Sequence, residues 1–252
     1  ATGEIIPLKD RIGILDRKLR IVNENAATEE EWLKWTLRAF QAVYGYEYQG
    51  DNLLVARINL LLTYTDYLQE RWNRKPTKKE LEEIAKVISW NLWQMDGLKG
   101  SIPLGALYEQ YHQLTIFDIF GMDDSAGEDE PEEYIPCRIY DWRGQNKSIE
   151  FNAFRERRNG SMKFDFIIGN PPYQEESVGA NANDTPVYHY FYDESFGIAD
   201  KVELITPARF LFNAGGTPKA WNEKMLADNH LKVIMYEQKS LRPLCHSLPA
   251  YP

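Results

Sequence analysis

Apolar side chains recur at intervals of three and four residues in several parts of the chain, which is the spacing of a helix that buries one face. Residues 29–43 show this pattern most clearly, with Trp32, Leu33 and Phe40 on one side and Thr28 placed as an N-cap before acidic residues. The same spacing predicts further helices over residues 50–72, 79–88, 187–196 and 218–227. The chain is therefore expected to be rich in amphipathic helices.

Short apolar or aromatic runs between these helices predict strands. They cover residues 44–48, 89–94, 135–142, 148–151, 164–169, 202–206 and 231–236. The run at 164–169, FDFIIG, is mostly apolar and is typical of a buried strand. Because strands alternate with helices, the sequence predicts an α/β fold with a mainly parallel sheet flanked by helices.

The composition limits the class of protein. The chain has 252 residues, 43% of them hydrophobic, which is enough to bury a sizeable core. Its 29 Lys and Arg against 38 Asp and Glu give a net charge of −9. This balance argues against a protein that coats nucleic acid by charge alone, but it allows an enzyme that meets DNA through one local cleft.

Cysteine usage and hydropathy narrow the class further. Cys137 and Cys245 stand alone and lack the spacing of metal ligands, so neither a disulfide framework nor a metal site is expected. No apolar run is long enough to span a membrane, and the first residues do not resemble a signal peptide. We therefore expect a cytoplasmic protein without membrane contact. The acidic run at 121–133 and the arginine-rich stretch at 155–158 are interpreted as solvated segments.

The tetrapeptide Asn170-Pro171-Pro172-Tyr173 follows the apolar run at 164–169 directly. Two consecutive prolines fix two φ angles and remove two backbone donors, so the Asn170 side chain and the nearby carbonyls keep little freedom. Rigid polar groups at the carboxyl end of a parallel strand lie where open α/β sheets bind ligands. An amide oxygen and a backbone carbonyl can accept the two hydrogens of a planar amine while a tyrosine ring stacks beside them. The tetrapeptide therefore indicates a site for a planar amine, such as the amino group of adenine.

The segment 164–174, FDFIIGNPPYQ, resembles the catalytic motif of adenine-specific N6 DNA methyltransferases that use S-adenosyl-L-methionine. The likeness is greatest to the methylase part of type IIG restriction-modification enzymes, where cleavage and methylation share one polypeptide. The resemblance implies a Rossmann-like S-adenosylmethionine-dependent methyltransferase fold. It also implies that the target adenine is flipped out of the duplex, stacks on Tyr173 and is hydrogen-bonded by Asn170 and the Pro171 carbonyl. No metal and no covalent intermediate is implied.

Two earlier stretches are similar to cofactor-binding motifs of the same family. Residues 44–57 resemble its second motif, which implies that Glu47 holds the ribose hydroxyls of the cofactor. Residues 91–98, NLWQMDGL, resemble the third motif, which implies that Asp96 contacts the amino group of the cofactor's adenine. The resemblance also places Asn170 among the residues that contact the cofactor.

Both ends of the chain depart from the family pattern. The start, ATGEI, resembles the tail of the first, glycine-rich motif, whose strand we expect to be missing, and Gly3 is its implied cofactor contact. Residues 241–252 do not continue the pattern. We therefore expect a methyltransferase catalytic domain over residues 1–240, with an insert at about 100–160, and an unassigned tail at 241–252. A separate specificity or nuclease subunit or domain is a candidate partner.

Two other functions stay open at this level. A methyltransferase that acts on protein glutamine or on RNA would share the NPPY motif, because its acceptor is also a planar amide or amine. A non-catalytic remnant that binds DNA or a partner protein would fit the incomplete first motif. The insert between Asp96 and Phe164 and the continuation Gln174-Glu175 favour the restriction-modification group, with double-stranded DNA as the partner.

Overall fold

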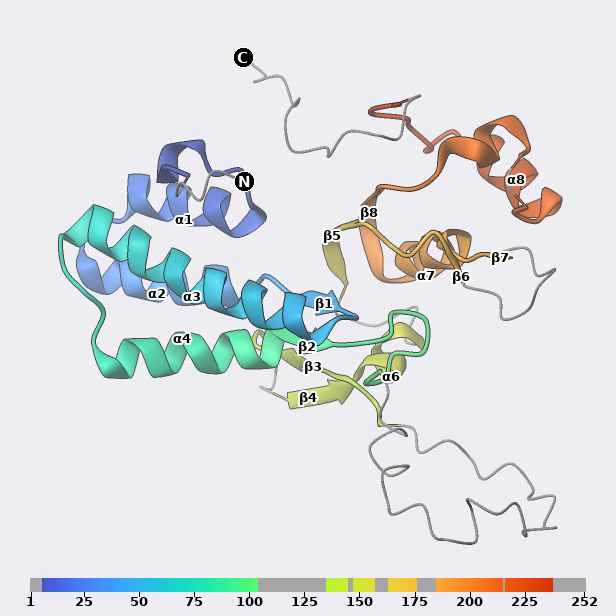
Figure 1. Cartoon of the computed structure of the whole chain (residues 1–252). Helices are drawn as coiled ribbons and strands as arrows, with labels where there is room; N and C mark the ends of the chain where they lie inside the picture. Colours follow the sequence, from blue (N-terminus) through green and yellow to red (C-terminus); the bar gives the residue numbers. More distant parts are fainter. Residues whose placement is uncertain are drawn as a thin grey trace, which may run out of the picture. The chain divides into compact units, whose positions relative to one another are not determined.

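The computed structural model describes residues 6–103, 135–144, 147–156, 163–175, 185–214 and 216–237. The chain divides into two compact units, Ala1–Met162 and Lys163–Pro252. Each unit is described by itself, and Figure 1 labels the elements of both. Gly3, most of the predicted insert at 100–160 and the tail at 241–252 lie outside the described residues.

The first unit begins with helices and continues into short strands. Its elements in chain order are η1 (Leu8–Asp10), α1 (Ile14–Asn25), α2 (Glu29–Gln41), β1 (Gly45–Glu47), α3 (Gly50–Trp72), α4 (Lys78–Asn91), β2 (Leu92–Gln94), β3 (Arg138–Asp141), β4 (Lys147–Glu150) and α6 (Phe151–Glu156). The helices predicted over 29–43 and 50–72 are confirmed as α2 and α3. η1 and α1 were not among the predicted elements.

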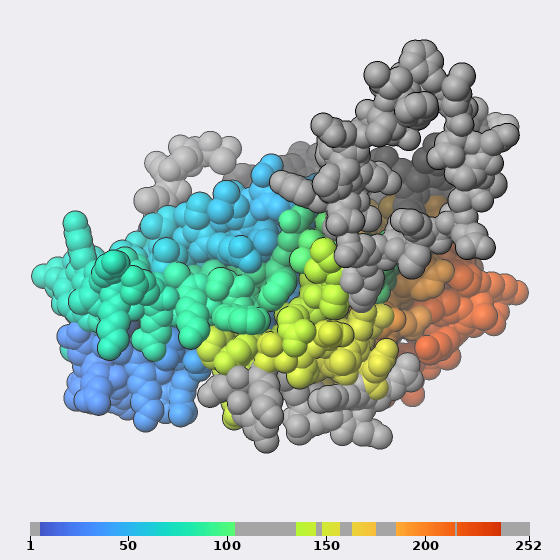
Figure 2. Space-filling view, turned by 90° about the horizontal axis from the view of Figure 1, so that it is seen from below, coloured from blue at the N-terminus to red at the C-terminus, as the bar shows by residue number. Residues whose placement is uncertain are grey.

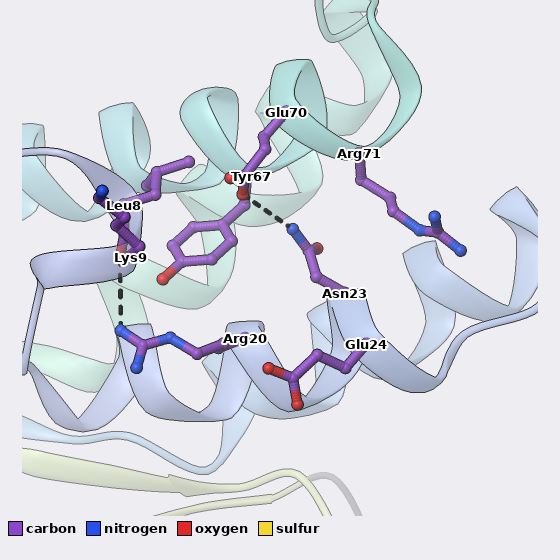
Figure 3. Close-up of a pocket in the computed structure, with 8 residues that line it drawn as sticks. All are labelled: Leu8, Lys9, Arg20, Asn23, Glu24, Tyr67, Glu70 and Arg71. Carbon is purple, nitrogen blue, oxygen red and sulfur yellow. Dashed lines mark hydrogen bonds between the residues drawn. The ribbon is translucent and has the colours of Figure 1, made fainter.

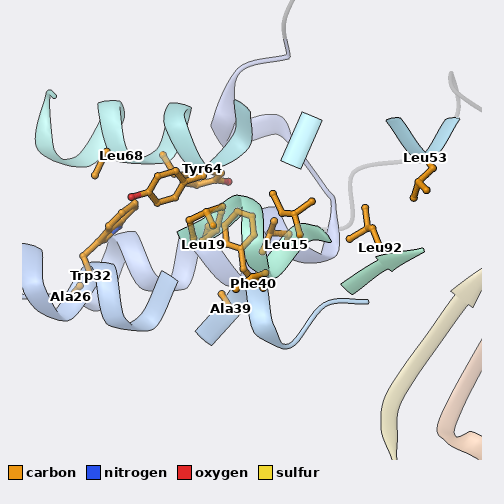
Figure 4. Close-up of a cluster of buried hydrophobic side chains, with 14 residues drawn as sticks. Leu15, Leu19, Ala26, Trp32, Ala39, Phe40, Leu53, Tyr64, Leu68 and Leu92 are labelled. Atoms are coloured by element: carbon orange, nitrogen blue, oxygen red, sulfur yellow. The ribbon is translucent and has the colours of Figure 1, made fainter. Parts of the chain in front are cut away.

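The core of the first unit lies between its long helices. Leu19 of α1, Trp32 of α2 and Leu68 of α3 have no exposed surface, and Trp32 meets Tyr64 with ring centroids 6.0 Å apart. Figure 4 shows these side chains converging between the helices, and Figure 2 shows α3 and α4 side by side. Each large apolar side chain buried in this way stabilises the unit by about 1.5–3 kcal/mol. The strands β1 and β2 therefore follow helices, α2 and α4, that are held in place by this core.

Side-chain caps fix the starts of two of these helices. The Thr28 hydroxyl accepts a hydrogen bond from the Glu31 N–H at 3.2 Å, which confirms the N-cap predicted for α2. At α4, Thr77 and Glu80 form a capping box, and Glu80 also pairs with the Arg74 guanidinium at an N···O distance of 2.7 Å. The hydrogen bond from Arg74 lowers the pKa of the Glu80 carboxyl to about 2.

Glu80→Gln is expected to lower the free energy of unfolding by about 1–2 kcal/mol at pH 7. The folded pKa of Glu80 lies below its ordinary value, so the stabilisation is complete above about pH 4.5 and is lost as the pH falls toward 2. Urea unfolding followed by helical circular dichroism at pH 7 and pH 3 should therefore show a smaller acid loss in the variant than in the wild type. Glu82→Gln is the control, because the Lys78–Glu82 pair is exposed and 3.7 Å apart. Equal acid losses in wild type and Glu80→Gln would contradict the role of this carboxylate.

The strands of the first unit form two small sheets. β1 and β2 are parallel and place Glu47 opposite Gln94. β3 and β4, which confirm the strands predicted at 135–142 and 148–151, form an antiparallel pair. The predicted strand at 89–94 was too long at its start. α4 continues to Asn91 because Val87, Ile88 and Asn91 are buried on one helical face, so the strand begins only at Leu92.

The second unit mixes strands and helices. Its elements are β5 (Phe164–Gly169), β6 (Gln174–Glu175), β7 (Thr185–Pro186), α7 (Tyr188–Ile198), β8 (Ala199–Leu204), η3 (Ala208–Phe212) and α8 (Lys219–Leu226). β5 and β8 are parallel, and β6 and β7 are antiparallel. The described residues thus form an α/β protein with four two-stranded sheets. Of the mainly parallel sheet that the strand and helix order predicted, they show two parallel pairs, β1 with β2 and β5 with β8.

Two strand predictions in the second unit are wrong in part. β5 exists, but it is not buried, since Phe166 and Ile168 are 60% and 58% exposed. Both side chains lie on one face of the β5–β8 pair, where the Lys201 Nζ lies 5.1 Å from the centroid of the Phe166 ring. Residues 231–236 form no strand, because no neighbouring strand pairs with them among the described residues. Ile234 is 75% exposed as a result.

Candidate functional site

The parallel pairing of β1 and β2 brings two predicted site residues to one strand edge. Glu47 is the last residue of β1, and the Met95 N–H donates a hydrogen bond to its backbone carbonyl at 3.0 Å. Asp96 is the next residue after Met95. Because parallel strands end at the same edge of a sheet, both carboxylates belong to the carboxyl edge of this pair (Figure 1).

The Glu47 carboxylate is held by the backbone of its own loop. Its Oε1 accepts a hydrogen bond from the Gln49 N–H at 3.0 Å, directly before α3 begins at Gly50. The side chain is half-buried. In the described part of the chain no hydrogen bond reaches its second oxygen, so one carboxylate oxygen is oriented and the other can accept a ligand hydroxyl.

Asp96 is held in a comparable way by a tight turn. Its Oδ1 accepts hydrogen bonds from the N–H groups of Leu98 at 2.9 Å and Lys99 at 3.1 Å. The turn is closed by the Gly100 N–H, which donates to the Asp96 carbonyl at 2.8 Å, and Gly100 has a φ of 67°, which glycine adopts without strain. Asp96 therefore also presents one oxygen fixed by backbone donors.

The tetrapeptide 170–173 lies at the carboxyl end of β5 in the second unit. The Ile205 N–H donates to the Gly169 carbonyl at 2.9 Å, and the Val187 N–H donates to the Tyr173 carbonyl at 3.2 Å. The backbone on either side of the tetrapeptide is thus tied to the segment after β8 and to the start of α7. Pro171 is buried, while Asn170, Pro172 and Tyr173 are exposed. Pro171 therefore anchors the segment, and the side chains of Asn170 and Tyr173 stay accessible.

Asn170 and Tyr173 contact each other directly. The Tyr173 hydroxyl donates a hydrogen bond to the Asn170 Oδ1 at 3.1 Å, which orients the amide and leaves one acceptor position on the same oxygen. The Tyr173 side chain is 43% exposed, so its ring can stack on a planar ligand. The geometry of these two side chains is compatible with the acceptor for a planar amine that the sequence predicted.

The neighbouring helix α7 contributes packing. Tyr188 and His189 are 2% and 4% exposed, and the His189 ring packs against Trp221 with ring centroids 5.6 Å apart. The His189 Nδ1 has no hydrogen-bond partner among the described residues, and burial lowers the pKa of this side chain. The Tyr192 hydroxyl contacts the Thr206 hydroxyl at 3.1 Å. Tyr188, His189 and Tyr192 are therefore buried packing residues, and Tyr192 packs next to the segment that follows β8.

The two sets of predicted residues belong to different units. Glu47 and Asp96 share an edge of the first unit, and residues 170–173 form one surface of the second. Gly3 lies outside the described residues. Sequence reasoning missed Gln94, which stands opposite Glu47 in the strand register. Gln94 lies two residues before Asp96, and nothing in its residue type or position marks it as a site residue in the sequence.

A pocket in the helical part of the first unit contains none of the predicted site residues. It has a volume of about 450 Å³ and is lined by η1, α1 and α3. Figure 3 shows hydrogen bonds within its lining, from the Asn23 Nδ2 to the Glu70 carboxylate and from the Arg20 guanidinium to the Leu8 carbonyl. The pocket is therefore separate from the predicted chemistry.

Two parallel strand pairs, packed with helices and followed by polar side chains at their carboxyl ends, define this chain as an α/β protein. Comparison with family models then identifies it more closely. The model of the Eco57I restriction-modification methylase family matches residues 41–241, which is more than half of the chain and includes Glu47, Asp96 and residues 170–173. The chain belongs to this family and is a restriction-modification methylase, a DNA methyltransferase.

Two further comparisons identified no similar protein. No match was found among curated proteins or among solved structures. In the described part of the chain, no helix has both the length and the apolar character needed to cross a membrane. The described residues also contain no group of three or more His, Cys, Asp or Glu side chains arranged to hold a metal ion.

Proposed function

We propose that this methylase transfers a methyl group from S-adenosyl-L-methionine to the N6 amino group of adenine in double-stranded DNA. The observation that supports it best is the contact between Asn170 and Tyr173 at the carboxyl end of β5. The pair offers an oriented amide oxygen beside an accessible aromatic ring, which suits the amino group and the ring of a flipped adenine.

The acceptor residues act by position and charge. The Asn170 Oδ1 and the Pro171 carbonyl each accept one hydrogen of the adenine amine, which draws the nitrogen lone pair out of conjugation with the ring. Tyr173 stacks on the base and holds it outside the duplex. The buried Pro171 and the bonded Tyr173 carbonyl keep these groups in place, so the reacting amine is aligned with little loss of entropy at the moment of reaction.

The carboxyl edge of β1 and β2 fits the nucleoside part of the cofactor. Glu47 and Asp96 each have one oxygen tied to backbone N–H groups, and the second oxygen of each can accept from ribose hydroxyls and from an adenine amino group, respectively. When bound, S-adenosylmethionine supplies the methyl group as an electrophile. Gly3 is proposed as the contact of its methionine part, and Asn170 as a further cofactor contact.

The proposal also includes a more specific fold for the chain. The strand and helix order, with two parallel pairs that end in functional residues, supports a Rossmann-like methyltransferase domain over residues 1–240. We also propose that the methylase works in the cytoplasm with DNA as its partner and with a separate specificity or nuclease subunit or domain. The family to which the chain belongs supports this view, because restriction-modification systems combine methylation with cleavage.

The test is methyl transfer by the chain itself. Incubation with labelled S-adenosylmethionine and unmethylated plasmid DNA is expected to label the DNA, and nucleoside analysis should find N6-methyladenine. RNA and a glutamine-containing peptide serve as control acceptors and should stay unlabelled. Equilibrium dialysis with the labelled cofactor should show saturable binding. Labelling of RNA or peptide would favour the other methyltransferase function, and the absence of saturable binding at millimolar cofactor would favour a non-catalytic DNA-binding or protein-binding role.

A further inference from the structure

Gln94 lies beside the loop that presents Glu47. It is the last residue of β2 and stands opposite Glu47 in the parallel register. Its Nε2 donates a hydrogen bond to the Tyr48 carbonyl at 3.0 Å. Its amide also lies close to Gly50, the first residue of α3, where an added Cβ would meet the Gln94 Oε1 at 3.4 Å. The side chain therefore bridges the end of β2 and the turn between β1 and α3.

The peptide unit between Tyr48 and Gln49 connects Gln94 to Glu47. Gln94 donates to the carbonyl of this unit, and the N–H of the same unit donates to the Glu47 Oε1 at 3.0 Å. A trans peptide is planar, and its C=O and N–H point in opposite directions. A donor that fixes the carbonyl on one side therefore fixes the direction of the N–H on the other side. The carbonyl bond also polarises the N–H and strengthens its bond to the carboxylate.

The rest of the turn is held from the side of the helix. The Gln49 side-chain Oε1 accepts a hydrogen bond from the Asn52 Nδ2 at 3.1 Å, and the Gln49 carbonyl accepts the first helical bond from the Leu53 N–H at 3.1 Å. On the strand side, the Cys137 thiol lies 3.4 Å from the Gln94 carbonyl. Gln94 is thus anchored in β2, and it is the side chain that fixes the peptide plane from the strand side.

We propose that Gln94 is a positioning residue for cofactor binding, which orients the Glu47 carboxylate through the Tyr48–Gln49 peptide. This inference rests on the proposed function, since it takes Glu47 as the ligand of the ribose hydroxyls. Gln94 does not contact the cofactor. It holds the N–H that ties the Glu47 Oε1, so the second oxygen points where the hydroxyls bind.

The experiment measures the Kd of S-adenosylmethionine for the full chain by isothermal titration calorimetry. Gln94→Met keeps the length of the side chain without its donor, and Gln94→Glu keeps its shape but can only accept. Both variants are expected to raise the Kd, by about three- to tenfold, because one solvent-accessible orienting bond is lost. Gln69→Met is the matched control, since Gln69 makes an equally exposed bond with Asn73 at the other end of α3, and its Kd should equal that of the wild type.

A double-mutant cycle separates positioning from a general structural effect. If Gln94 acts through Glu47, then Gln94→Met has no further effect on the Kd once Glu47→Gln is present. Independent, multiplicative effects in the double variant would overturn the proposal, as would a wild-type Kd in Gln94→Met and Gln94→Glu. Urea unfolding midpoints of all variants report whether the fold is kept.

The same data distinguish this inference from the proposed function. If the wild type shows no saturable binding, or if Glu47→Gln binds the cofactor as well as the wild type, the assignment of Glu47 fails and the role of Gln94 fails with it. If the wild type binds and Glu47→Gln weakens binding, but the Gln94 variants do not, only the role of Gln94 is overturned.

Discussion

Asn170→Ala is expected to reduce the rate of methyl transfer to DNA by about a hundred- to a thousandfold, because one oriented polar group at the reacting centre is removed. The Asn170 Oδ1 is already held by the Tyr173 hydroxyl at 3.1 Å, so the wild-type amide needs little reorganisation to receive the amine. Alanine cannot accept either hydrogen of that amine. The adenine nitrogen then keeps its lone pair in the ring system and becomes a weaker nucleophile.

The measurement is single-turnover transfer of labelled methyl groups to plasmid DNA at saturating cofactor. The Kd for the cofactor should change less than the rate, because Glu47 and Asp96 are unaltered. Asn229→Ala is the matched control, an exposed asparagine of the same unit in the turn after α8, and it should retain the wild-type rate. A rate for Asn170→Ala within a few-fold of the wild type would exclude the role proposed for this amide.

Asn91→Leu is expected to lower the free energy of unfolding by about 2–4 kcal/mol. Asn91 is 1% exposed at the junction of α4 and β2. Its Nδ2 donates to the carbonyls of Phe40 at 3.1 Å and Val43 at 3.0 Å, and its Oδ1 accepts from the Trp142 Nε1 at 2.7 Å. Leucine has a similar volume but leaves two carbonyls and one indole N–H buried without these partners.

Urea unfolding followed by tryptophan fluorescence measures this loss. Asn25→Leu is the control, because Asn25 is exposed and, among the residues that the structure describes, its side chain bonds only to the Ile21 carbonyl of its own helix. The stability of this variant should stay within about 0.5 kcal/mol of the wild type. Asn91→Leu should also weaken cofactor binding, since the amide joins the end of α2 and the turn after β3 to the start of β2. A stability equal to that of Asn25→Leu would show that water replaces the lost bonds and that the amide is not essential to the fold.

Local patterns predicted the long helices well. α2, α3 and α8 lie within a few residues of the ranges predicted from apolar spacing, and at α2 the Thr28 cap marks the start as well. α1 was missed although Leu15, Leu19 and Val22 recur at helical spacing and pack in the core, and its start at Gly13 carries no side-chain cap to mark it. Strand lengths were less accurate, as at Ser89 to Asn91, where burial of one helical face extended α4.

The candidate site residues show the same contrast between what the local sequence predicts and what tertiary packing decides. The sequence by itself determined which residues are candidates for the chemistry, since the segment 170–173 follows a predicted strand, Asp96 comes shortly after another, and Glu47 lies near the end of a third. Only the tertiary structure decided what surrounds them. The register of β1 with β2 placed Gln94 opposite Glu47, and no local pattern encodes a contact between residues 46 positions apart. Burial was also decided in three dimensions, because Phe166 and Ile168 are as apolar as core residues and yet lie exposed. A sequence specifies the preferences of each segment, whereas pairing and burial depend on which other segments pack against it.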